Sequence, residues 1–508
     1  MPSFHTVLIA NRGEIAVRVA RTLRTRGQHS IALFHAVDRD ALHVAACDRA
    51  VELTGDDPRA AYLDVEQVVA AAKSAGAQAI HPGYGFLSEQ GRFARAVEAA
   101  GLVFIGPRPE TLETVGDKRS ARAAARAAGL PVAPGWEGDP LDAAGRPTAE
   151  AIAAAKKLGF PLLLKAVSGG GGKGMRTIDD AGALAEGLAG TAREALASFG
   201  NAAVYLERRL EPVRHVEVQF LGDGEGGAWH LLERECSLQR RHQKVIEESP
   251  GARVDAALRK RLTDATKALA REVRYRGVGT AEFLVDEAGE PHFLEVNARI
   301  QVEHPVTELV TGRDLVGLQL DIAAGLGLPG DLEPAAPHGH AVEARLYAED
   351  PAHDFLPQSG PIAFLRLPAG PFVRVDAGVR AGDAIGLHFD PMIAKITTWG
   401  PDRASAYARL RVALEETEVA GVVTNLAFLR VLVAHPDVLA GETTTTQIER
   451  AIAPAWRKAR VAGADDALLA AAALAALEGT VARGGGATPG ADAGPWSTLA
   501  GFRLGEEG

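Results

Sequence analysis

The chain has 508 residues, 47 % of them hydrophobic and 24 % charged, which is ordinary for a globular protein of about two to four domains. This composition excludes a chain that is disordered throughout. The net charge of −10 argues against a strongly basic nucleic-acid-binding or membrane-surface protein, although a local basic cleft could hold an anion. The two cysteines, Cys47 and Cys236, rule out a disulfide scaffold and indicate a reducing compartment.

Signals for membrane insertion or export are weak. The longest strongly apolar run, 467–477, has 11 residues, whereas a spanning helix needs about 20. The N-terminus has no basic leader and no small-residue cleavage site, so we interpret residues 6–10 as the first strand of the fold. We therefore expect a cytoplasmic protein with neither a membrane nor a nucleic-acid partner.

The N-terminal stretch alternates short apolar runs with amphipathic helices. Such alternation predicts a parallel sheet covered by helices. Ligands in such sheets gather at the carboxyl ends of the strands, which here are residues 11–14 and 81–85. The expected strands are 6–10, 30–34, 77–83 and 102–106, and the expected helices are 16–24 and 65–75.

Further along the chain the composition and the expected secondary structure change several times. A helix and loop are expected over 119–150, and a small strand-and-helix unit over 160–210. Strand-like runs follow, and a last mixed block, with a helix at 404–415, ends near residue 455. The strand-like runs are 216–220, 229–234, 280–285 and 291–296. An Ala/Leu-rich helix at 467–477 and a Gly/Pro/Ala stretch at 484–495 then indicate a docking helix and a linker.

A run of glycines, 169–172, follows an apolar strand and is flanked by Lys165 and Lys173. Consecutive glycines let backbone N–H groups converge on an anion and let a loop close over it. The run is not a Walker A loop, because Lys173 is followed by Gly174 and not by Ser or Thr. A flexible hairpin tip is the alternative, but the strand and the paired lysines favour a lid over phosphates.

Two strand-like runs flank a turn at 286–290. With a two-residue loop at 288–289, Glu282 faces Glu295 across a hairpin, and Asn297 lies on the same face as Glu295. Facing carboxylates destabilise a hairpin unless a cation sits between them. Oxygen ligands of this kind suit Mg²⁺ or Mn²⁺, which bridge nucleotide phosphates, so the hairpin predicts a metal site.

The alternative for these carboxylates is a solvated acidic face. The assumed register places Leu284 opposite Phe293 on that face, which favours burial. A slip of one residue would destroy both pairings, because side chains alternate between the two faces of a strand.

Charged side chains become denser after the hairpin. Arg299, Gln301 and Glu303 alternate, so one strand-like face would carry all three. His242 and Lys244 lie in a separate run of basic residues. Clusters of mixed sign are costly to bury and rarely serve stability alone, which favours a functional site over a salt-bridged surface.

Motifs spread in order over residues 4–450 resemble the biotin carboxylase family of the ATP-grasp superfamily. They are ANRGEIAVR (10–18), HPGYGFLSE (81–89), GDKRSAR (116–122), SGGGGKGM (168–175), RHVEVQ (214–219), ERECSLQRRHQKVIEE (233–248) and EVNARIQVEHPVTE (295–308). Several of these blocks are long, so chance does not account for them. The resemblance implies ATP-dependent carboxylation of biotin by bicarbonate, the first half-reaction of a biotin-dependent acyl-CoA carboxylase.

The resemblance also implies a fold class, α/β and in part α+β. An N-terminal parallel-sheet domain would be followed by an ATP-grasp domain with a mobile glycine-rich lid and by a C-terminal mixed α/β domain. The expected boundaries are 1–118 for the N-terminal domain, 119–338 for the ATP-grasp domain with its lid at 133–209, 339–455 for the C-terminal domain and 456–508 for a helical tail and linker.

ATP and a divalent ion, Mg²⁺ or Mn²⁺, are the implied cofactors. The positions that match the family's ATP-binding residues are Lys118, Lys165, Gly171, Gly172, Glu207, Arg208, Leu210, His215, Gln239, His242 and Leu284. Those that match its metal ligands are Glu282, Glu295 and Asn297. Arg208 departs from the family pattern, which usually has lysine there, and its bulkier planar guanidinium could alter a contact beside the adenine.

The resemblance assigns the chemistry to a further set of residues. Glu303 would be the general base that deprotonates bicarbonate for attack on the γ-phosphate, and Arg345 would stabilise the biotin enolate. The implied catalytic residues are Glu303, Arg299, Arg345 and Lys244. Bicarbonate would be held by Lys244, Arg299, Gln301 and the Val302 backbone, and biotin would contact Tyr84 and Arg345.

The sequence contains no tip that would accept biotin. None of its methionines, Met1, Met175 and Met392, is followed by lysine. We therefore expect biotin to arrive on a separate carrier domain or protein, with a carboxyltransferase subunit and a homodimer or larger assembly as further partners. Residues 494–504 are similar to the linker that follows this part of acyl-CoA carboxylase α subunits, of the methylcrotonyl- or geranyl-CoA type, and a disordered tail is the alternative.

Two other functions compete with this one. The chain could be another ATP-grasp ligase, or a scaffold that binds nucleotide in a carboxylase complex without turnover. The unbroken RIQVEHPVTE and HQKVIEE blocks count against the ligase. The presence of Glu303, Lys244, Arg299 and Arg345 counts against the scaffold.

Overall fold

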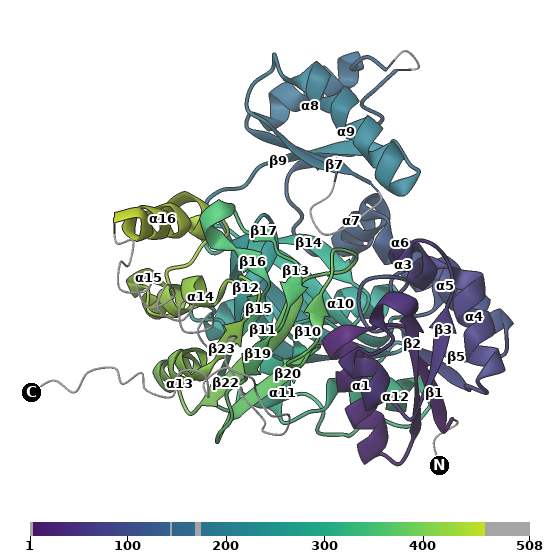
Figure 1. Cartoon of the computed structure of the whole chain (residues 1–508). Helices are drawn as coiled ribbons and strands as arrows, with labels where there is room; N and C mark the ends of the chain where they lie inside the picture. The colour runs from purple at the N-terminus through teal and green to yellow at the C-terminus, as the bar shows by residue number, and fades with distance from the viewer. Residues whose placement is uncertain (1–3, 143–144, 168–173, 463–508) are drawn as a thin grey trace, which may run out of the picture. The chain divides into compact units, whose positions relative to one another are not determined.

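The computed structural model describes residues 4–142, 145–167 and 174–462 (Figure 1). The chain divides into two compact units, 1–450 and 451–508. Over the described ranges, no helix combines the length and the apolar character needed to cross a membrane. The glycine run with Gly171 and Gly172, the expected helix at 467–477 and the linker that follows it lie outside the described residues.

The N-terminal sheet is parallel, in the order β3-β2-β1-β4-β5. Its strands are β1 (Thr6–Ile9), β2 (His29–His35), β3 (Arg49–Leu53), β4 (Ala79–His81) and β5 (Val103–Phe104). The predicted parallel sheet is thus confirmed. The edge strand β3 was not predicted from the sequence, because most of its side chains are exposed and it lacks a continuous apolar run.

Helices follow the strands of this sheet in sequence. They are α1 (Gly13–Thr25), α2 (Leu42–Ala46), α3 (Pro58–Leu63), α4 (Val65–Ser74), α5 (Gly91–Ala99), α6 (Pro109–Gly116) and α7 (Lys118–Ala127), with a 3₁₀ turn η1 (Ala36–Asp38). The carboxyl ends of β1 and β4 meet as predicted, since Asn11 Nδ2 donates to the carbonyls of Pro82 (2.8 Å) and Tyr84 (2.7 Å). Gly83 has φ +64°, and a Cβ there would lie 2.7 Å from Asn11 Nδ2, so this close approach requires glycine.

The segment that was predicted to form a lid contains a small antiparallel sheet in the order β6-β9-β7-β8. Its elements are β6 (Gly135–Trp136), α8 (Ala149–Leu158), β7 (Leu162–Ala166), β8 (Met175–Ile178), α9 (Leu184–Phe199) and β9 (Val204–Arg208). Apolar side chains of these strands and helices, among them Leu164, Ile178 and Leu188, form a core of their own.

A large sheet in the order β14-β13-β10-β11-β12-β15-β22-β20 carries most of the predicted site. Its strands are β10 (Arg214–Asp223), β11 (Ala228–Arg240), β12 (Gln243–Ser249), β13 (Arg276–Val285), β14 (Pro291–Asn297), β15 (His340–Tyr347), β20 (Val373–Ala377) and β22 (Met392–Gly400). Helices α10 (Ala256–Glu272), α11 (His304–Thr311), α12 (Leu315–Ala323) and α13 (Arg403–Glu416) accompany it. Because β12 pairs with β15, the sheet runs on across the expected boundary at 338/339.

Shorter elements complete the first unit. They are β16 (Glu349–Asp350), β17 (Leu356–Pro357), β18 (Gly360–Pro361), β19 (Phe364–Arg366), β21 (Ala384–Ile385), β23 (Glu418–Ala420), α14 (Leu426–Val433), α15 (Pro436–Ala440) and the 3₁₀ turn η2 (Pro351–His353). A π-helical turn, η3 (Ile448–Ile452), spans the division between the two units. The described part of the second unit continues with α16 (Ala453–Ala462).

The register of the carboxylate hairpin differs from the assumed one. Glu282 does pair with Glu295, but Phe283 pairs with Phe293, so Leu284 faces His292 and not Phe293. The prediction about Leu284 is therefore wrong. The loop has three residues, because the N–H of Asp286 bonds to the carbonyl of Glu290 (3.1 Å), which shifts the register by one.

A bulge at Leu294 shifts the register back, so Glu282 and Glu295 pair despite the longer loop. At this edge of the sheet the N–H of Phe293 is taken by the carbonyl of Pro131 (2.7 Å), and Val132 forms a bridge with Phe293. The hairpin thus gains a long-range partner that its own sequence does not reveal.

Residues 299–303 are not a strand. Strand β14 ends at Asn297, and an irregular segment leads to Glu303, which is the N-cap residue of α11. The expectation that Arg299, Gln301 and Glu303 share one strand face is therefore wrong. Pro305 in the first turn of α11 favours helix initiation at this point, which ends the extended backbone early.

Candidate active site

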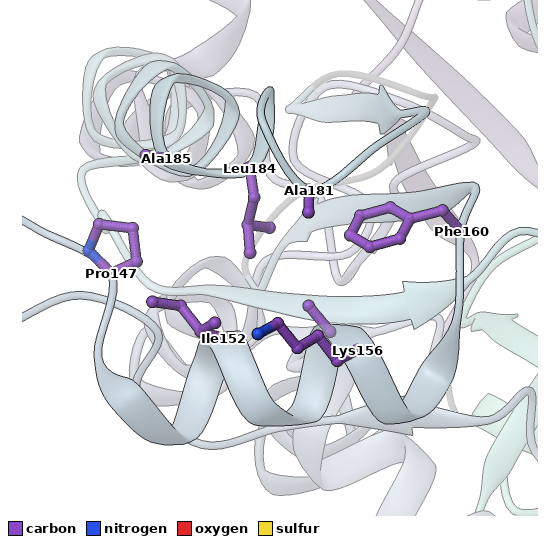
Figure 2. A pocket seen from close by; sticks show the side chains of 8 residues that line it. Pro147, Ile152, Lys156, Phe160, Ala181, Leu184 and Ala185 are labelled. Atoms are coloured by element: carbon purple, nitrogen blue, oxygen red, sulfur yellow. The ribbon is translucent and has the colours of Figure 1, made fainter.

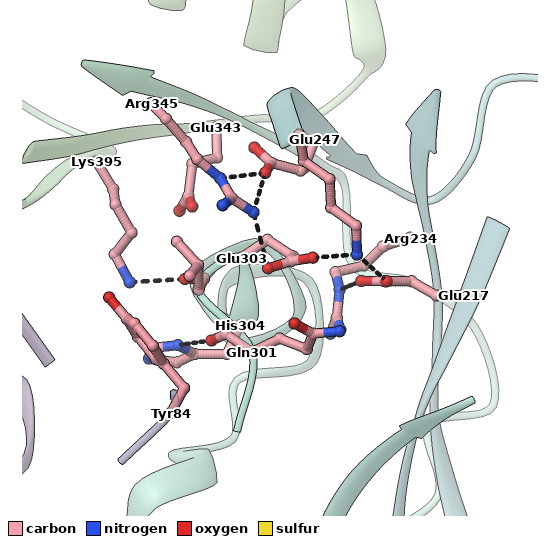
Figure 3. Close-up of polar contacts among 12 residues, drawn as sticks. Tyr84, Glu217, Arg234, Glu247, Gln301, Glu303, His304, Glu343, Arg345 and Lys395 are labelled. Carbon is pink, nitrogen blue, oxygen red and sulfur yellow. Dashed lines mark hydrogen bonds and ion pairs between the residues drawn. The ribbon is translucent and has the colours of Figure 1, made fainter. Parts of the chain in front are cut away.

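Glu303 lies at the centre of a buried cluster of charges, between two cations from neighbouring strands (Figure 3). Its Oε1 is 2.6 Å from Lys244 Nζ on β12, and its Oε2 is 3.0 Å from the guanidinium of Arg345 on β15. The side chain of Glu303 is 0 % exposed. The helix N-terminus of α11 and the β12–β15 ladder therefore bring together three of the four residues predicted to be catalytic.

The cations decide the charge state of Glu303. Burial alone would raise its pKa, but Lys244 and Arg345 together hold the pKa of Glu303 well below its ordinary value. Burial likewise opposes the charge on Lys244, yet Glu217, Glu282 and Glu303 keep the pKa of that ammonium well above its ordinary value. At neutral pH the pair is thus carboxylate and ammonium, and the unprotonated carboxylate is the form that can accept a proton.

Lys244 also connects Glu303 with the hairpin. Its Nζ donates to Glu282 Oε1 (3.0 Å) and to Glu217. Glu282 further accepts hydrogen bonds from Asn297 Nδ2 (2.7 Å) and Gln301 Nε2 (3.0 Å). Burial opposes ionisation here too, but Lys244 and then His215 hold the pKa of Glu282 well below its usual range. The hairpin and the mixed-charge cluster, predicted separately, therefore form one site.

Arg299 reaches both parts of this site. Its guanidinium donates to Gln301 Oε1 (2.8 Å) and to Asn297 Oδ1 (2.8 Å), and it lies 3.4 Å from Glu89. The guanidinium is thereby held beside the residues predicted to bind bicarbonate. Fixed donors of this kind suit a planar oxyanion.

The three predicted metal ligands present oxygen atoms on or beside the β13–β14 hairpin. Glu282 and Glu295 face each other across the ladder, and Asn297 contacts Glu282. Glu295 Oε2 lies 3.4 Å from Lys118 Nζ. Two carboxylates and an amide oxygen are a hard donor set that fits Mg²⁺ or Mn²⁺, which would neutralise phosphate charge when bound.

A second group of predicted ATP-binding residues gathers where the small sheet adjoins α7. Lys165 on β7 donates to Glu207 on β9, whose other oxygen lies 2.8 Å from Arg122 on α7. Arg122 also bonds to Glu137 (2.6 Å) and is almost fully buried. The carboxylate of Glu207 thus holds Lys165 in place near the C-terminal end of β7.

The remaining predicted nucleotide-binding residues differ in exposure. Arg208 and His242 are exposed, Leu210 and Leu284 are half-buried, and Gln239 is buried. His215 faces Leu284 in the β10–β13 ladder and lies 3.1 Å from Glu282, and Gln239 faces Lys244 in the β11–β12 ladder. Leu284 therefore lies on the same strand as Glu282, and His215 and Gln239 lie on β10 and β11 of the same sheet.

Tyr84, predicted to contact biotin, follows β4 and is half-buried. Its hydroxyl donates to Glu14 on α1. Arg345, the other predicted biotin contact, is engaged with Glu303 and with Glu247.

Sequence reasoning missed three buried residues of the cluster. Arg234 is fully buried, and its guanidinium donates to Glu217 (2.6 Å), Gln219 (2.6 Å), Thr307 (2.9 Å) and Thr280 (3.2 Å). Glu217 is the shared partner of Arg234 and Lys244 (Figure 3). Glu247 binds the guanidinium of Arg345. All three lie inside quoted motifs, but their burial is a property of the fold, and no sequence signal separates them from charged residues that face solvent.

A cavity of about 110 Å³ lies elsewhere, between α8 and α9 of the small sheet's domain (Figure 2). Its walls are mostly apolar, including Ile152, Phe160 and Leu184, and Lys156 is its charged member. A nucleotide needs a site of about 300 Å³ or more, so this cavity is too small for ATP.

Comparison with known proteins finds biotin carboxylase sequences and structures over most of the chain. Three family models match in succession: biotin carboxylase, N-terminal domain, at residues 3–112; carbamoyl-phosphate synthase L chain, ATP binding domain, at 117–330; and biotin carboxylase C-terminal domain at 343–450. A biotin carboxylase from Nostoc is 42 % identical, over 88 % of this chain and 99 % of that protein.

Longer relatives also match. The mitochondrial methylcrotonoyl-CoA carboxylase subunit alpha of Dictyostelium discoideum is 42 % identical over 98 % of this chain and 70 % of its own length. The chain spans 61 % of the mouse subunit, at 44 % identity over 87 % of this chain. It therefore corresponds to only part of these α subunits.

Among solved structures, biotin carboxylase from Campylobacter jejuni in a β,γ-ATP complex matches with a TM-score of 0.84 and 37 % identity, over 88 % of this chain and 99 % of that one. The biotin carboxylase domain dimer of 2-oxoglutarate carboxylase from Hydrogenobacter thermophilus, in complex with MgADP and bicarbonate, has a TM-score of 0.84 and 39 % identity, over 88 % and 97 %.

Fold and charge cluster together define an ATP-grasp enzyme, an ATP-dependent carboxylating ligase. The chain belongs to the biotin carboxylase family, which confirms the predicted family, the predicted fold class and ATP-dependent carboxylation of biotin as its reaction. ATP and a divalent metal are accordingly the cofactors expected of it.

Proposed function

We propose that the chain carboxylates biotin carried by a separate domain or protein, as the biotin carboxylase part of an acyl-CoA carboxylase α subunit. The α subunits of methylcrotonoyl-CoA and propionyl-CoA carboxylase among its relatives support this role. The buried contact of Glu303 with Lys244 and Arg345 is the observation that carries the chemical part of the proposal.

In the proposed reaction, Glu303 accepts the proton of bicarbonate while Lys244, Arg299, Gln301 and the Val302 backbone hold the anion. The bicarbonate oxygen then bonds to the γ-phosphorus of ATP, and the bond to ADP breaks. The C–O bond of the carboxyphosphate then breaks, which releases CO₂ and phosphate next to biotin. The phosphate accepts the proton of the biotin ureido N–H, and that nitrogen bonds to the carbon of CO₂. Arg345 stabilises the biotin enolate as a fixed cation, and Tyr84 contacts the biotin.

We also propose which residues bind the nucleotide and which bind the metal. Lys118, Lys165, His215 and Gln239 would contact the nucleotide, and Gly171 and Gly172 would close over its phosphates. The adenine and ribose pocket would be lined by Glu207, Arg208, Leu210, His242 and Leu284. Glu282, Glu295 and Asn297 would hold the metal. The domain boundaries at 118/119, 338/339 and 455/456 are likewise a proposal.

Isotope transfer tests this function. The 508-residue chain is incubated with ATP, Mg²⁺, ¹⁴C-bicarbonate and free biotin, and acid-labile label on biotin is measured together with ADP. We expect label and ADP to appear only when both bicarbonate and biotin are present. ADP that forms without biotin, with an added amine as acceptor, would instead indicate another ATP-grasp ligase, and no ADP would leave a nucleotide-binding scaffold.

The proposed function is accompanied by a proposal about binding partners and a proposal about cellular location. We propose a homodimer within a carboxylase that also has a carboxyltransferase subunit; the dimeric domain of Hydrogenobacter thermophilus supports the first half. We also propose a cytoplasmic location, since both cysteines are free thiols, as in a reducing compartment. Gel filtration of the chain and pull-down of biotinylated protein from its source test the partners.

A further inference from the structure

Lys395 on β22 holds the backbone of the turn that precedes Glu303. Its side chain is 0 % exposed, and its Nζ donates to the carbonyl of Val302 at 2.7 Å (Figure 3). That carbonyl and the N–H of Glu303 belong to one planar peptide group. Because the group is planar, a bond to the carbonyl also fixes the direction in which the backbone enters Glu303.

The ladder between β15 and β22 places Lys395 directly opposite Arg345. The two cations bind successive residues of the same turn, since Arg345 contacts the carboxylate of Glu303 at 3.0 Å. The preceding residue is held as well, because His304 Nδ1 lies 2.8 Å from the carbonyl of Gln301. The turn from 301 to 303 is thus fixed at three successive positions, and Lys395 supplies the middle one.

Lys395 also contacts two carboxylates, those of Glu14 on α1 and Asp376 on β20. Its Nζ lies 3.3 Å from Glu14 Oε2 and 3.8 Å from Asp376 Oδ2. The other oxygen of Glu14 accepts the hydroxyl hydrogen of Tyr84. A chain of direct contacts therefore runs from Tyr84 through Glu14 and Lys395 to Val302.

We propose that Lys395 is a positioning residue of the carboxylation reaction: it fixes the bicarbonate-binding turn and, through Glu14, joins that turn to Tyr84. This inference rests on the proposed roles of Val302, Glu303 and Tyr84. Lys395 itself touches the backbone and not the reacting atoms. Its loss should affect turnover and bicarbonate binding while ATP binding stays intact.

Steady-state kinetics of Lys395→Met test the proposal, because methionine matches the lysine side chain as far as the ε position and lacks the ammonium group. We expect kcat to fall about 10- to 100-fold and KM for bicarbonate to rise, with KM for ATP unchanged. Lys267→Met is the matched control. Lys267 lies on α10, and its partly buried ammonium group is 3.1 Å from Glu333. The kinetics of this variant should equal those of the wild type.

The double variant Lys395→Met/Glu14→Gln separates positioning from charge balance. Removing Lys395 alone leaves buried Glu14 uncompensated, which lowers thermal stability. The double variant removes both charges, so its melting temperature should recover while kcat stays low. If kcat recovers together with the melting temperature, Lys395 only balances charge and the inference is wrong. Should the single variant not fold, the double variant carries the same test.

The wild-type reaction in the same assay separates this inference from the proposed function. Wild-type protein that forms no labelled biotin would refute the proposed function. Wild-type activity with an unchanged kcat in Lys395→Met would refute the positioning role alone. A rise in KM for ATP equal to the fall in kcat would also overturn it, because that pattern indicates general disruption of the fold.

Discussion

Glu282 lies directly opposite Glu295 in the ladder between β13 and β14, and a bulge at Leu294 brings the two carboxylates into this register. Each carboxylate lies beside a cation: Lys244 is 3.0 Å from Glu282 and is shared with Glu217 and Glu303, and Lys118 is 3.4 Å from Glu295. Like charges placed opposite each other need such compensation. The same two strands can therefore present oxygen ligands to a metal without an uncompensated charge when the metal is absent.

This arrangement predicts that Glu295→Gln weakens metal dependence. The amide retains the shape of the side chain but loses the negative charge that attracts a divalent ion. We expect the Mg²⁺ concentration for half-maximal ADP formation to rise about tenfold or more. Glu290→Gln is the control: Glu290 lies on the same hairpin, and its exposed ion pair with Arg261 of α10 is removed. An unchanged Mg²⁺ titration in Glu295→Gln would refute the metal site.

Replacing Glu303 by glutamine should remove the proton acceptor while keeping the shape of the side chain. We expect biotin-dependent ADP formation to fall about 10²- to 10⁴-fold, the usual contribution of a general base. ATP binding should persist, because Glu303 contacts Lys244 and Arg345 and none of the predicted nucleotide ligands of the small sheet. Turnover is measured by coupled ADP assay and ATP binding by calorimetry. Undiminished turnover would exclude Glu303 as the base.

Glu247→Gln should misplace Arg345. Glu247 binds the guanidinium of Arg345 from the neighbouring strand, and the amide replaces a charge-assisted contact with a weaker one. We predict a fall in kcat of about tenfold with an unchanged KM for ATP. Kinetics with free biotin as the varied substrate measure the effect. If kcat and KM for biotin both equal the wild-type values, Glu247 does not position Arg345.

The Glu343–Glu247 pair should make stability depend on pH. These buried carboxylates face each other across the β12–β15 ladder. Burial raises the pKa of Glu343 to about 8, with Lys395 opposing and Glu247 adding to the rise. The folded chain therefore holds a proton that the unfolded chain releases above pH 4.5, so this contribution to stability is lost as pH rises toward 8.

Glu343→Gln resembles the protonated form at every pH, and its amide oxygen can still accept the hydrogen bond from Thr397 (2.6 Å). Its melting temperature relative to wild type should therefore be higher at pH 8 than at pH 6. The limiting effect is about 1.4 kcal/mol per pH unit. Thermal unfolding at the two pH values measures it. A difference in melting temperature that does not change with pH would show that Glu343 is ionised throughout.

Much of the fold could be predicted from local patterns. The alternation of apolar runs and amphipathic helices located β1, β2, β4 and β5 to within a few residues. Strand β3 was missed because most of its side chains are exposed, and the charged residues Arg49 and Glu52 interrupt its apolar residues. The irregular backbone from 299 to 303 was missed because a period of two also fits a turn with three polar side chains.

The hairpin shows where local patterns stop being sufficient. Glu282 and Glu295 pair as predicted, but through a three-residue loop and a compensating bulge, and the contact between Phe293 and Pro131 lies far away in sequence. Arg234 and Glu247 were overlooked for a similar reason. On a strand, a charged residue that is buried looks the same in sequence as one that faces solvent, and only tertiary contacts distinguish them.

A crystal structure of the chain with bicarbonate, Mg²⁺ and a non-hydrolysable ATP analogue shows whether one cluster of charges holds both the metal and the bicarbonate. We predict bicarbonate between Lys244, Arg299 and the backbone of Val302, within hydrogen-bonding distance of Glu303, and a metal ion between Glu282 and Glu295. Bicarbonate bound away from Glu303, with Glu282 and Glu295 pointing apart and no metal between them, would contradict this prediction.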